Sequence, residues 1–98
     1  MTAEERANEL AGKLADAKAI DVKTYDVRGK SGFTDFFVVA TGAAAPHLKA
    51  LVRTMPKAYR VSGDPESGWI VADYIDVVVH VFSAEARAYY ALEKLWEQ

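Results

Sequence analysis

The chain has 98 residues, of which 51% are hydrophobic and 27% are charged, a composition typical of one globular domain. It contains no cysteine, which excludes disulfides, thiolate nucleophiles and iron–sulfur clusters and agrees with a reducing, cytoplasmic environment. No apolar run approaches the roughly 20 residues that span a membrane, and residues 1–10 lack the apolar region of a secretory signal. We therefore expect one cytoplasmic domain over residues 1–98, without a membrane anchor.

The net charge of −2 conceals an uneven distribution along the chain. Residues 1–63 carry ten Lys/Arg and seven Asp/Glu, whereas residues 64–98 carry two Lys/Arg and seven Asp/Glu. Naked nucleic acid needs a basic patch, so this acidic C-terminal third argues against direct nucleic-acid recognition. An acidic surface suits a basic protein partner, but acidic residues also keep any small domain soluble, and composition leaves both interpretations open.

The first half of the chain predicts a helix and two strands. The helix begins at a capping box formed by Thr2 and Glu5 and continues, with apolar residues at helical spacing, to about Lys18. Residues 22–27 include β-branched and aromatic residues, as in a strand, and a glycine-containing loop follows them. Residues 35–41 are apolar on both faces, which indicates a strand in the interior of the sheet.

The second half predicts two helices and three more strands. Pro56 disfavours the helical conformation of the residue before it and so ends the second helix, and Ser83 is a good N-cap for the last one. Only Ile75 and Asp76 separate the final two strands, which is hairpin spacing. The predicted elements are a helix over residues 47–55, strands over 58–62, 69–74 and 77–82, and a helix over 83–96.

This order of elements predicts a single domain of the α/β (α+β) class, in which helices pack on a mixed sheet of about five strands. One face of the last helix carries the residues expected to dock on the sheet: Ala88, Tyr89, Leu92, Leu95 and Trp96. The residues expected on its other side are Tyr90, Glu93, Lys94 and Glu97.

One short pattern suggests phosphate binding. Gly29-Lys30-Ser31 resembles part of a phosphate-binding loop, but Thr24 stands where the full motif needs its first glycine. The loop also leads into a strand instead of a helix N-terminus, so the backbone amides that would hold a phosphate are missing. A flexible basic turn is therefore the better interpretation.

Asp73 and Asp76 form a second pattern, because a carboxylate pair could hold Mg²⁺ beside a nucleotide. They flank a tight turn, however, where aspartate is ordinary turn chemistry. His80 lies in a run of valines, and a lone histidine in a strand is usually a hydrogen-bonded core residue. No serine has the spacing of a catalytic triad. We therefore predict that the protein is not an enzyme and has no catalytic residue, metal site or cofactor.

Trp69 opens a strand directly after a turn, where a large ring is often only partly covered. Exposed aromatic residues beside acidic groups have the composition of a protein-binding hot spot, and Asp73, Tyr74 and Asp76 follow closely in the sequence. Trp69 could equally well cover the core, and the sequence favours neither interpretation.

Three segments resemble the sequence motifs of one family, the Iojap-type ribosome-silencing factors. Asp26–Gly42 resembles its first motif, Asp73–Phe82 its second, and Glu85–Trp96 its C-terminal helix. The resemblance begins near residue 5 and covers nearly all of the remaining chain, with the motifs in the family's order. It implies a mixed sheet with helices, related in topology to nucleotidyltransferase domains but without their catalytic residues.

The resemblance also implies a function. Family members bind the large ribosomal subunit through ribosomal protein L-fourteen, on the face where the small subunit docks, and so repress translation when nutrients are scarce. They also form homodimers in crystals. Two alternatives stay open: a large-subunit assembly factor that uses the same surface, and a Mg²⁺-dependent enzyme of the nucleotidyltransferase type.

The family's partner-facing region corresponds here to a strand and the turn that follows it. The resemblance implies that the partner-binding residues of this chain are Trp69, Asp73, Tyr74, Asp76 and His80. Trp69 and Tyr74 are expected to supply apolar area, and the two aspartates to pair with Lys or Arg of a basic partner. His80 is expected to project from the sheet as a polar contact.

The chain departs from the family at two places. Ile75 stands where the family usually has glycine, and a tight turn there needs a positive φ, which costs a β-branched residue roughly 1–2 kcal/mol. Between His47 and Trp69 the chain is about eight residues shorter than the family, roughly two helical turns. The apolar surface that this segment normally covers must be covered in another way or left open for a partner.

Overall fold

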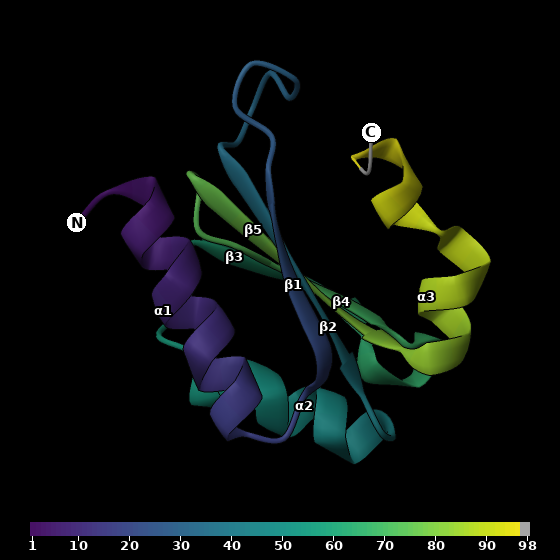
Figure 1. The fold of residues 1–98 in the computed structure, drawn as a ribbon. Helices are drawn as coiled ribbons and strands as arrows, with labels where there is room; N and C mark the ends of the chain where they lie inside the picture. Colours follow the sequence, from purple (N-terminus) through teal and green to yellow (C-terminus); the bar gives the residue numbers. More distant parts are fainter. Residues whose placement is uncertain (97–98) are drawn as a thin grey trace.

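In the computed structural model, which describes residues 1–96, helices lie on both faces of one sheet (Figure 1). The helices and strands follow the predicted order, and two short 3-10 turns are added. The helices are α1 (Ala3–Asp16), α2 (Ala45–Thr54) and α3 (Ala84–Tyr90), and the 3-10 turns are η1 (Pro65–Ser67) and η2 (Leu92–Leu95). The strands are β1 (Ile20–Asp26), β2 (Phe36–Gly42), β3 (Arg60–Asp64), β4 (Trp69–Asp73) and β5 (Val77–Ser83).

The five strands lie in the order β1-β2-β5-β4-β3. β2 and β5 are parallel and the other neighbouring pairs are antiparallel, so the sheet is mixed, as predicted. All seven residues of β2 are buried, and so are all residues of β5 except the last. Because this parallel pair lies at the centre of the sheet with protein on both faces, both strands are apolar on both faces.

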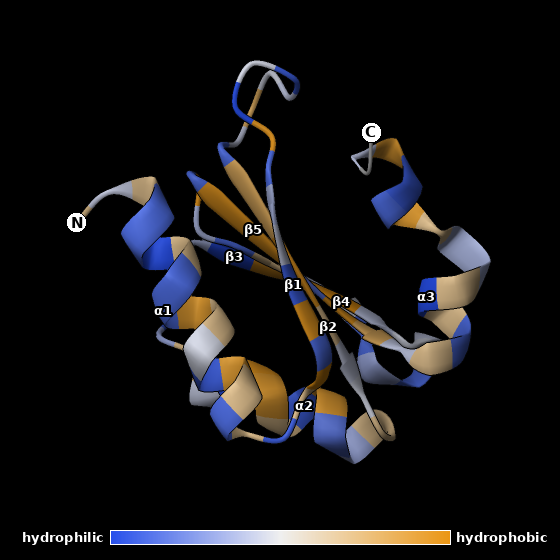
Figure 2. Ribbon diagram, in the orientation of Figure 1, coloured by the Kyte–Doolittle hydropathy of each residue, from blue (hydrophilic) through white to orange (hydrophobic). Residues whose placement is uncertain are grey.

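α1 and α2 cover one face of the sheet (Figure 1). The capping box fixes the start of α1: the Glu5 amide donates to Thr2 Oγ1 (3.1 Å), and the Thr2 amide donates to the Glu5 carboxylate (2.8 Å). The apolar side of α1 faces the sheet and its polar side faces solvent (Figure 2). The core on this face includes Ala7, Leu10, Leu14, Leu48, Leu51, Phe36, Val38, Ala40, Ile70, Val79 and Val81.

The last helix is shorter than predicted. α3 ends at Tyr90 because Ala91 adopts a left-handed conformation with a φ of 48°, and η2 then follows. The prediction of which residues dock on the sheet is therefore wrong in part, because helical spacing does not continue through Ala91. Its exposed members are Ala88, Tyr89 and Leu95. The residues that pack on the sheet are Ala86, Leu92 and Trp96. Glu97 lies outside the described residues.

Arg87 ties η2 to the sheet. Its guanidinium group, only 11% exposed, donates to both carboxylate oxygens of Glu93 at 2.6 and 2.9 Å. It also donates to the Thr41 hydroxyl and the Asp21 carbonyl, each at 2.8 Å. Tyr25 of β1 donates its hydroxyl to Glu93 as well. Hydrogen bonds from Arg87 lower the pKa of Glu93, so this carboxylate stays charged and the connection is retained at neutral pH.

The connection between β4 and β5 is a tight turn over Tyr74, Ile75 and Asp76. The Asp76 amide donates to the Tyr74 carbonyl (3.0 Å), and Ile75 between them has a φ of 76°. These are the features of a γ-turn, a rare and strained form, in place of the two-residue primed turn that hairpin spacing suggests. Ile75 thus adopts the positive φ that the resemblance implied. The Asp73 carboxylate stabilises the turn by accepting from the Ile75 amide (2.7 Å).

The short α2 leaves one edge of the sheet open. The helix contacts β2, β5 and η1, and all five residues of β3 are exposed. Val61 pairs with the buried Ala72 on the α2 side of the sheet, yet it is 51% exposed. Part of the α2 face of the sheet, at the β3 edge, is therefore open to solvent.

Candidate functional site

β4 divides its residues between the two faces of the sheet. Ile70 and Ala72 are buried beneath α1 and α2, whereas Trp69, Val71 and Asp73 are half-buried on the opposite face. On that face α3 contacts mainly β5 and β2, so the strip along β4 stays accessible. We refer to this strip, together with the α3 residue that contacts it, as the β4 surface: Trp69, Val71, Asp73 and Tyr90.

Trp69 is both a core residue and a surface residue. Its ring packs against Phe82 and Tyr90, with centroids 5.1 and 4.6 Å apart. Its indole Nε1 donates to His80 Nδ1 at 3.1 Å, which holds the ring in one orientation. The residue nevertheless remains partly exposed. Trp69 therefore covers part of the core, as one interpretation of the sequence predicts, and keeps the partial exposure that the hot-spot interpretation requires.

His80 lies in the sheet beside Trp69 and is only 7% exposed, although it was expected to project as a polar contact. The rings of Phe37 and Phe82 lie 5.0 and 6.0 Å from the imidazole. Because Nδ1 accepts from Trp69, the proton of the neutral ring is assigned to Nε2, which has no hydrogen-bond partner within residues 1–96. Burial lowers the pKa of His80 to about 4, so the ring is neutral at pH 7.

Asp73 and Asp76 flank the turn that follows β4. The Asp73 carboxylate accepts from the Ile75 amide at 2.7 Å. The Asp76 carboxylate pairs with Arg6 of α1 at 3.1 Å, and its main-chain carbonyl accepts from two amides at the start of β2. Both carboxylates therefore stabilise local structure, and both residues keep part of their surface exposed.

Tyr74 points to the side of the sheet opposite Trp69. It packs against the α1–α2 core, and its hydroxyl donates to the Pro56 carbonyl at 2.5 Å. Burial raises the pKa of this hydroxyl. The five residues implied by the resemblance thus do not form one continuous surface. The α3 side of the sheet carries Trp69, Asp73 and His80. Tyr74 lies on the other side, and Asp76 lies at the turn beside α1.

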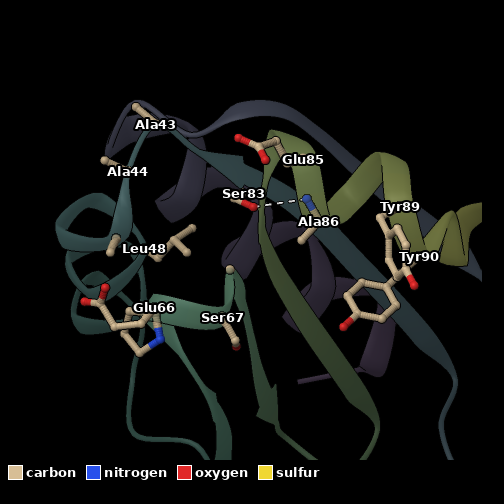
Figure 3. A pocket seen from close by; sticks show the side chains of 13 residues that line it. Ala43, Ala44, Leu48, Glu66, Ser67, Ser83, Glu85, Ala86, Tyr89 and Tyr90 are labelled. Carbon is tan, nitrogen blue, oxygen red and sulfur yellow. Dashed lines mark hydrogen bonds between the residues drawn. The ribbon is translucent and has the colours of Figure 1, made fainter.

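A pocket of about 620 Å³ opens next to the β4 surface (Figure 3). It lies beyond the carboxyl ends of the parallel strands β2 and β5, where β2 leads to α2 on one face and β5 leads to α3 on the other. Ligands of open α/β sheets usually bind at such a switch point. The side chains that line it include Leu48, Glu66, Ser83, Glu85, Tyr89 and Tyr90.

Tyr89 and Tyr90 are candidates that sequence reasoning missed. The predicted helix placed Tyr90 away from the sheet, but α3 brings its ring onto Trp69, at 4.6 Å between centroids. The same prediction docked Tyr89 on the sheet, whereas it is 82% exposed and lines the pocket. The sequence does contain a signal for these residues: two adjacent tyrosines follow an acidic residue in the first turn of the helix. Helical spacing alone does not show which of the two tyrosines faces the sheet.

The other sequence patterns are used by local structure. The amides of Lys30 and Ser31 both donate to the Val27 carbonyl, at 3.0 and 2.9 Å, so they are not directed at a phosphate. Across residues 1–96, no group of three or more His, Asp or Glu lies close enough to hold a metal ion. In the same part of the chain, no helix has both the length and the apolar character needed to cross a membrane.

The sheet has an accessible aromatic strip, and the polar side chains near it stabilise turns. These features are typical of small α/β binding domains. Comparison with known proteins identifies the family. Residues 1–98 match the family described as "Ribosomal silencing factor during starvation", and the chain belongs to this family. The resemblance seen in the three sequence motifs is thereby confirmed.

Several relatives are similar over most of the chain. The ribosomal silencing factor of Treponema pallidum is 36% identical over 99% of this chain and 95% of that protein, and that of Haemophilus influenzae is 36% identical over 89% and 93%. A mouse protein named mitochondrial assembly of ribosomal large subunit protein 1 is 30% identical over 89% of this chain and 43% of that protein. A crystal structure from Chromobacterium violaceum, 28% identical, has a TM-score of 0.90 over 98% of this chain and 87% of that one, which confirms the predicted fold class.

Proposed function

We propose that this chain is a cytoplasmic regulator that binds the large ribosomal subunit through ribosomal protein L-fourteen and prevents the small subunit from joining. Its family supports a role in ribosomal silencing. The observation that carries a protein-binding site is Trp69: its ring is held by His80, remains partly exposed, and shares the β4 surface with Asp73. Tryptophan is one of the residues enriched among binding hot spots.

The β4 surface offers apolar and charged contacts together. Trp69 and Tyr90 form one aromatic anchor, because their rings pack against each other in a tilted arrangement. Asp73, on the same face, can pair with Lys or Arg of a basic ribosomal protein. Tyr74 and Asp76 serve the site indirectly: they fasten the turn after β4 to the core and to α1.

The proposed mechanism is steric and needs no chemistry. The domain measures 33 × 27 × 21 Å, whereas contacts between two subunits require heavy atoms within about 3–4 Å of each other. A body of this size on the joining face therefore separates the two subunits over the area it covers. Binding of the factor and binding of the small subunit become mutually exclusive there.

Sucrose-gradient sedimentation of purified bacterial subunits, with and without the protein, tests the proposal. We expect the protein to co-sediment with large subunits and the peak of joined ribosomes to fall as the protein is added. A protein that stays at the top of the gradient, or that binds without reducing the joined peak, contradicts the silencing mechanism.

A large-subunit assembly factor is the second candidate, favoured by the name of the mouse relative. Such a factor would bind the same kind of surface but need not prevent mature subunits from joining. The joining assay separates the two functions, because only the silencing factor lowers the joined peak when both subunits are mature. Co-sedimentation with large subunits at an unchanged joined peak would favour the assembly role.

A further inference from the structure

The pocket at the ends of β2 and β5 has walls from three elements: α2, η1 and α3 (Figure 3). Glu66 of η1 and Glu85 of α3 contribute two carboxylates to it. We propose that the pocket receives a lysine or arginine side chain of the protein that binds the β4 surface, an inference that rests on the proposed function. The bound group would be a side chain of a basic ribosomal protein and not a free metabolite.

The charge of the pocket supports a cationic occupant. Within residues 1–96, neither Glu66 nor Glu85 forms an ion pair, and none of the described lining residues is basic. The N-termini of α2 and α3 also line the pocket, and their partial positive charges by themselves would attract an anion. Two full negative charges exceed the roughly half charge of each helix N-terminus, so the opening remains negative and favours an ammonium or guanidinium group over a phosphate.

The aromatic lining supports the same kind of occupant. Tyr89 is 82% exposed, and it meets Tyr90 edge to face, with centroids 5.1 Å apart at 87°. A ring so exposed adds little to the core, but it offers a face to a cation, which aromatic rings attract through their quadrupole. Carboxylates and tyrosines around one opening are the groups that recognise arginine and lysine.

The pocket is continuous with the β4 surface. Tyr90 lines the pocket and also packs against Trp69, at 4.6 Å between centroids. A partner that covers Trp69 therefore reaches the mouth of the pocket without any change in the fold. The volume of about 620 Å³ accommodates one long basic side chain together with water.

The test compares pocket variants with matched controls in binding to purified large subunits at low and moderate salt. The variants are Glu66→Gln with Glu85→Gln, and separately Tyr89→Ala. We expect about fivefold weaker binding for the double variant and about threefold for Tyr89→Ala, with a shallower salt dependence for the double variant. Replacing both glutamates with lysine should weaken binding further, because the pocket would then repel the partner's cation.

The controls alter the same kinds of residue elsewhere. Glu9→Gln with Asp16→Asn removes two exposed carboxylates from α1, and Phe33→Ala removes a ring that is 75% exposed in the loop before β2, at the other end of the strands. Thermal unfolding followed by circular dichroism verifies that every variant is folded. These controls should bind large subunits as tightly as the wild type.

The outcomes separate this inference from the proposed function. If Trp69→Ala weakens binding while the pocket variants, including the lysine pair, bind normally, the cation site is wrong and the proposed function stands. If pocket variants and α1 controls weaken binding equally, the effect is general electrostatics and the site is again wrong. If the wild type does not bind large subunits at all, the proposed function itself fails, and the inference fails with it.

Discussion

Trp69 and His80 act as a pair at the candidate site. The hydrogen bond between their rings, 3.1 Å long, fixes the indole, and the buried imidazole stays neutral because burial lowers its pKa to about 4. A side chain that is already ordered loses less conformational entropy when a partner binds, which increases affinity. We therefore expect His80 to contribute to partner binding by orienting Trp69, and not by direct contact.

Replacing Trp69 with alanine should weaken binding to large subunits by about 2–4 kcal/mol, the range of hot-spot residues. The fold should survive, with a loss of stability because His80 also loses its donor. Binding is measured by co-sedimentation well below the unfolding temperature. As a control, Ile20→Ala shortens a side chain that is 52% exposed in the edge strand β1, and this variant should bind normally. Equal binding by both variants would move the interface away from β4.

Stability should fall on acidification because of His80. The unfolded ring has a pKa near 6.5 and the folded ring about 4, so the unfolded state binds more protons between these values. The contribution is fully present above pH 6.5 and is lost as the pH falls toward 4. We expect this residue to account for about 2 kcal/mol of lost unfolding free energy between pH 7 and pH 5.

Urea unfolding at both pH values checks this prediction, with His80→Gln as the comparison because glutamine does not titrate. The wild type should lose more stability than the variant over this range. A proton-resonance titration of the His80 ring supplies the folded pKa directly. An ordinary midpoint near 6.5, or an equal loss of stability in both proteins, would contradict the prediction.

Ile75 occupies a backbone conformation that suits glycine. Its φ of 76° costs a β-branched residue roughly 1–2 kcal/mol, while its side chain is 61% exposed and adds little packing. Ile75→Gly should therefore raise the free energy of unfolding by about 1 kcal/mol, after allowing for the greater entropy of glycine in the unfolded chain. Val61→Gly, at a residue that is 51% exposed in β3, should instead lower it. Urea unfolding of the two variants measures both changes in unfolding free energy. A loss of stability in Ile75→Gly would mean that the turn is not strained.

At the scale of elements, the C-terminal segment is joined to the sheet by side-chain hydrogen bonds as well as by packing. Ala91 ends α3, so η2 cannot rely on helical hydrogen bonds from the preceding turn. Arg87 and Glu93 replace them with a nearly buried ion pair that also engages β1 and β2. This arrangement holds Trp96 against Phe37, at 5.0 Å between centroids.

Removing this ion pair should therefore be costly. Arg87→Met leaves the Glu93 carboxylate without its cationic partner in a site where the two side chains are only 11% and 15% exposed. We expect a loss of about 3 kcal/mol in unfolding free energy and faster hydrogen exchange in residues 92–96. Arg28→Met removes an exposed pair with Asp26, whose side chains are 55% and 50% exposed, and should cost far less, because solvent screens the pair. Similar losses in the two variants would show that burial does not govern the Arg87 pair.

Elements also show where sequence reasoning succeeds and fails. The capping box at Thr2 and the doubly apolar strands β2 and β5 were predicted correctly, because each depends on residues close together in the chain. The end of α3 at Tyr90 was not predicted. It depends on the left-handed conformation of Ala91, which allows Leu92 of η2 to pack on the sheet. A local pattern cannot include that distant contribution.

At the scale of the whole molecule, silencing by steric exclusion has a thermodynamic consequence. If the factor and the small subunit cannot occupy the large subunit together, each lowers the apparent affinity of the other by the same factor. Small subunits in excess should therefore displace the protein, and joined ribosomes should carry none of it. Sedimentation at increasing small-subunit concentration measures this displacement. Persistent binding of the factor to joined ribosomes would rule out exclusion as the mechanism.

The sequence by itself determined the family, the order of the elements and the central place of β2 and β5, because motifs and periodicity are local properties. The resemblance also named Trp69 and Asp73 as partner-binding candidates, and the two-residue period of β4 places them on one face. Only the tertiary structure decided that Tyr74 points away from them, that His80 is buried beside Trp69, and that Tyr90 completes the aromatic anchor. These placements depend on strand pairing and on the turn at Ala91, which bring together residues that are far apart in the chain.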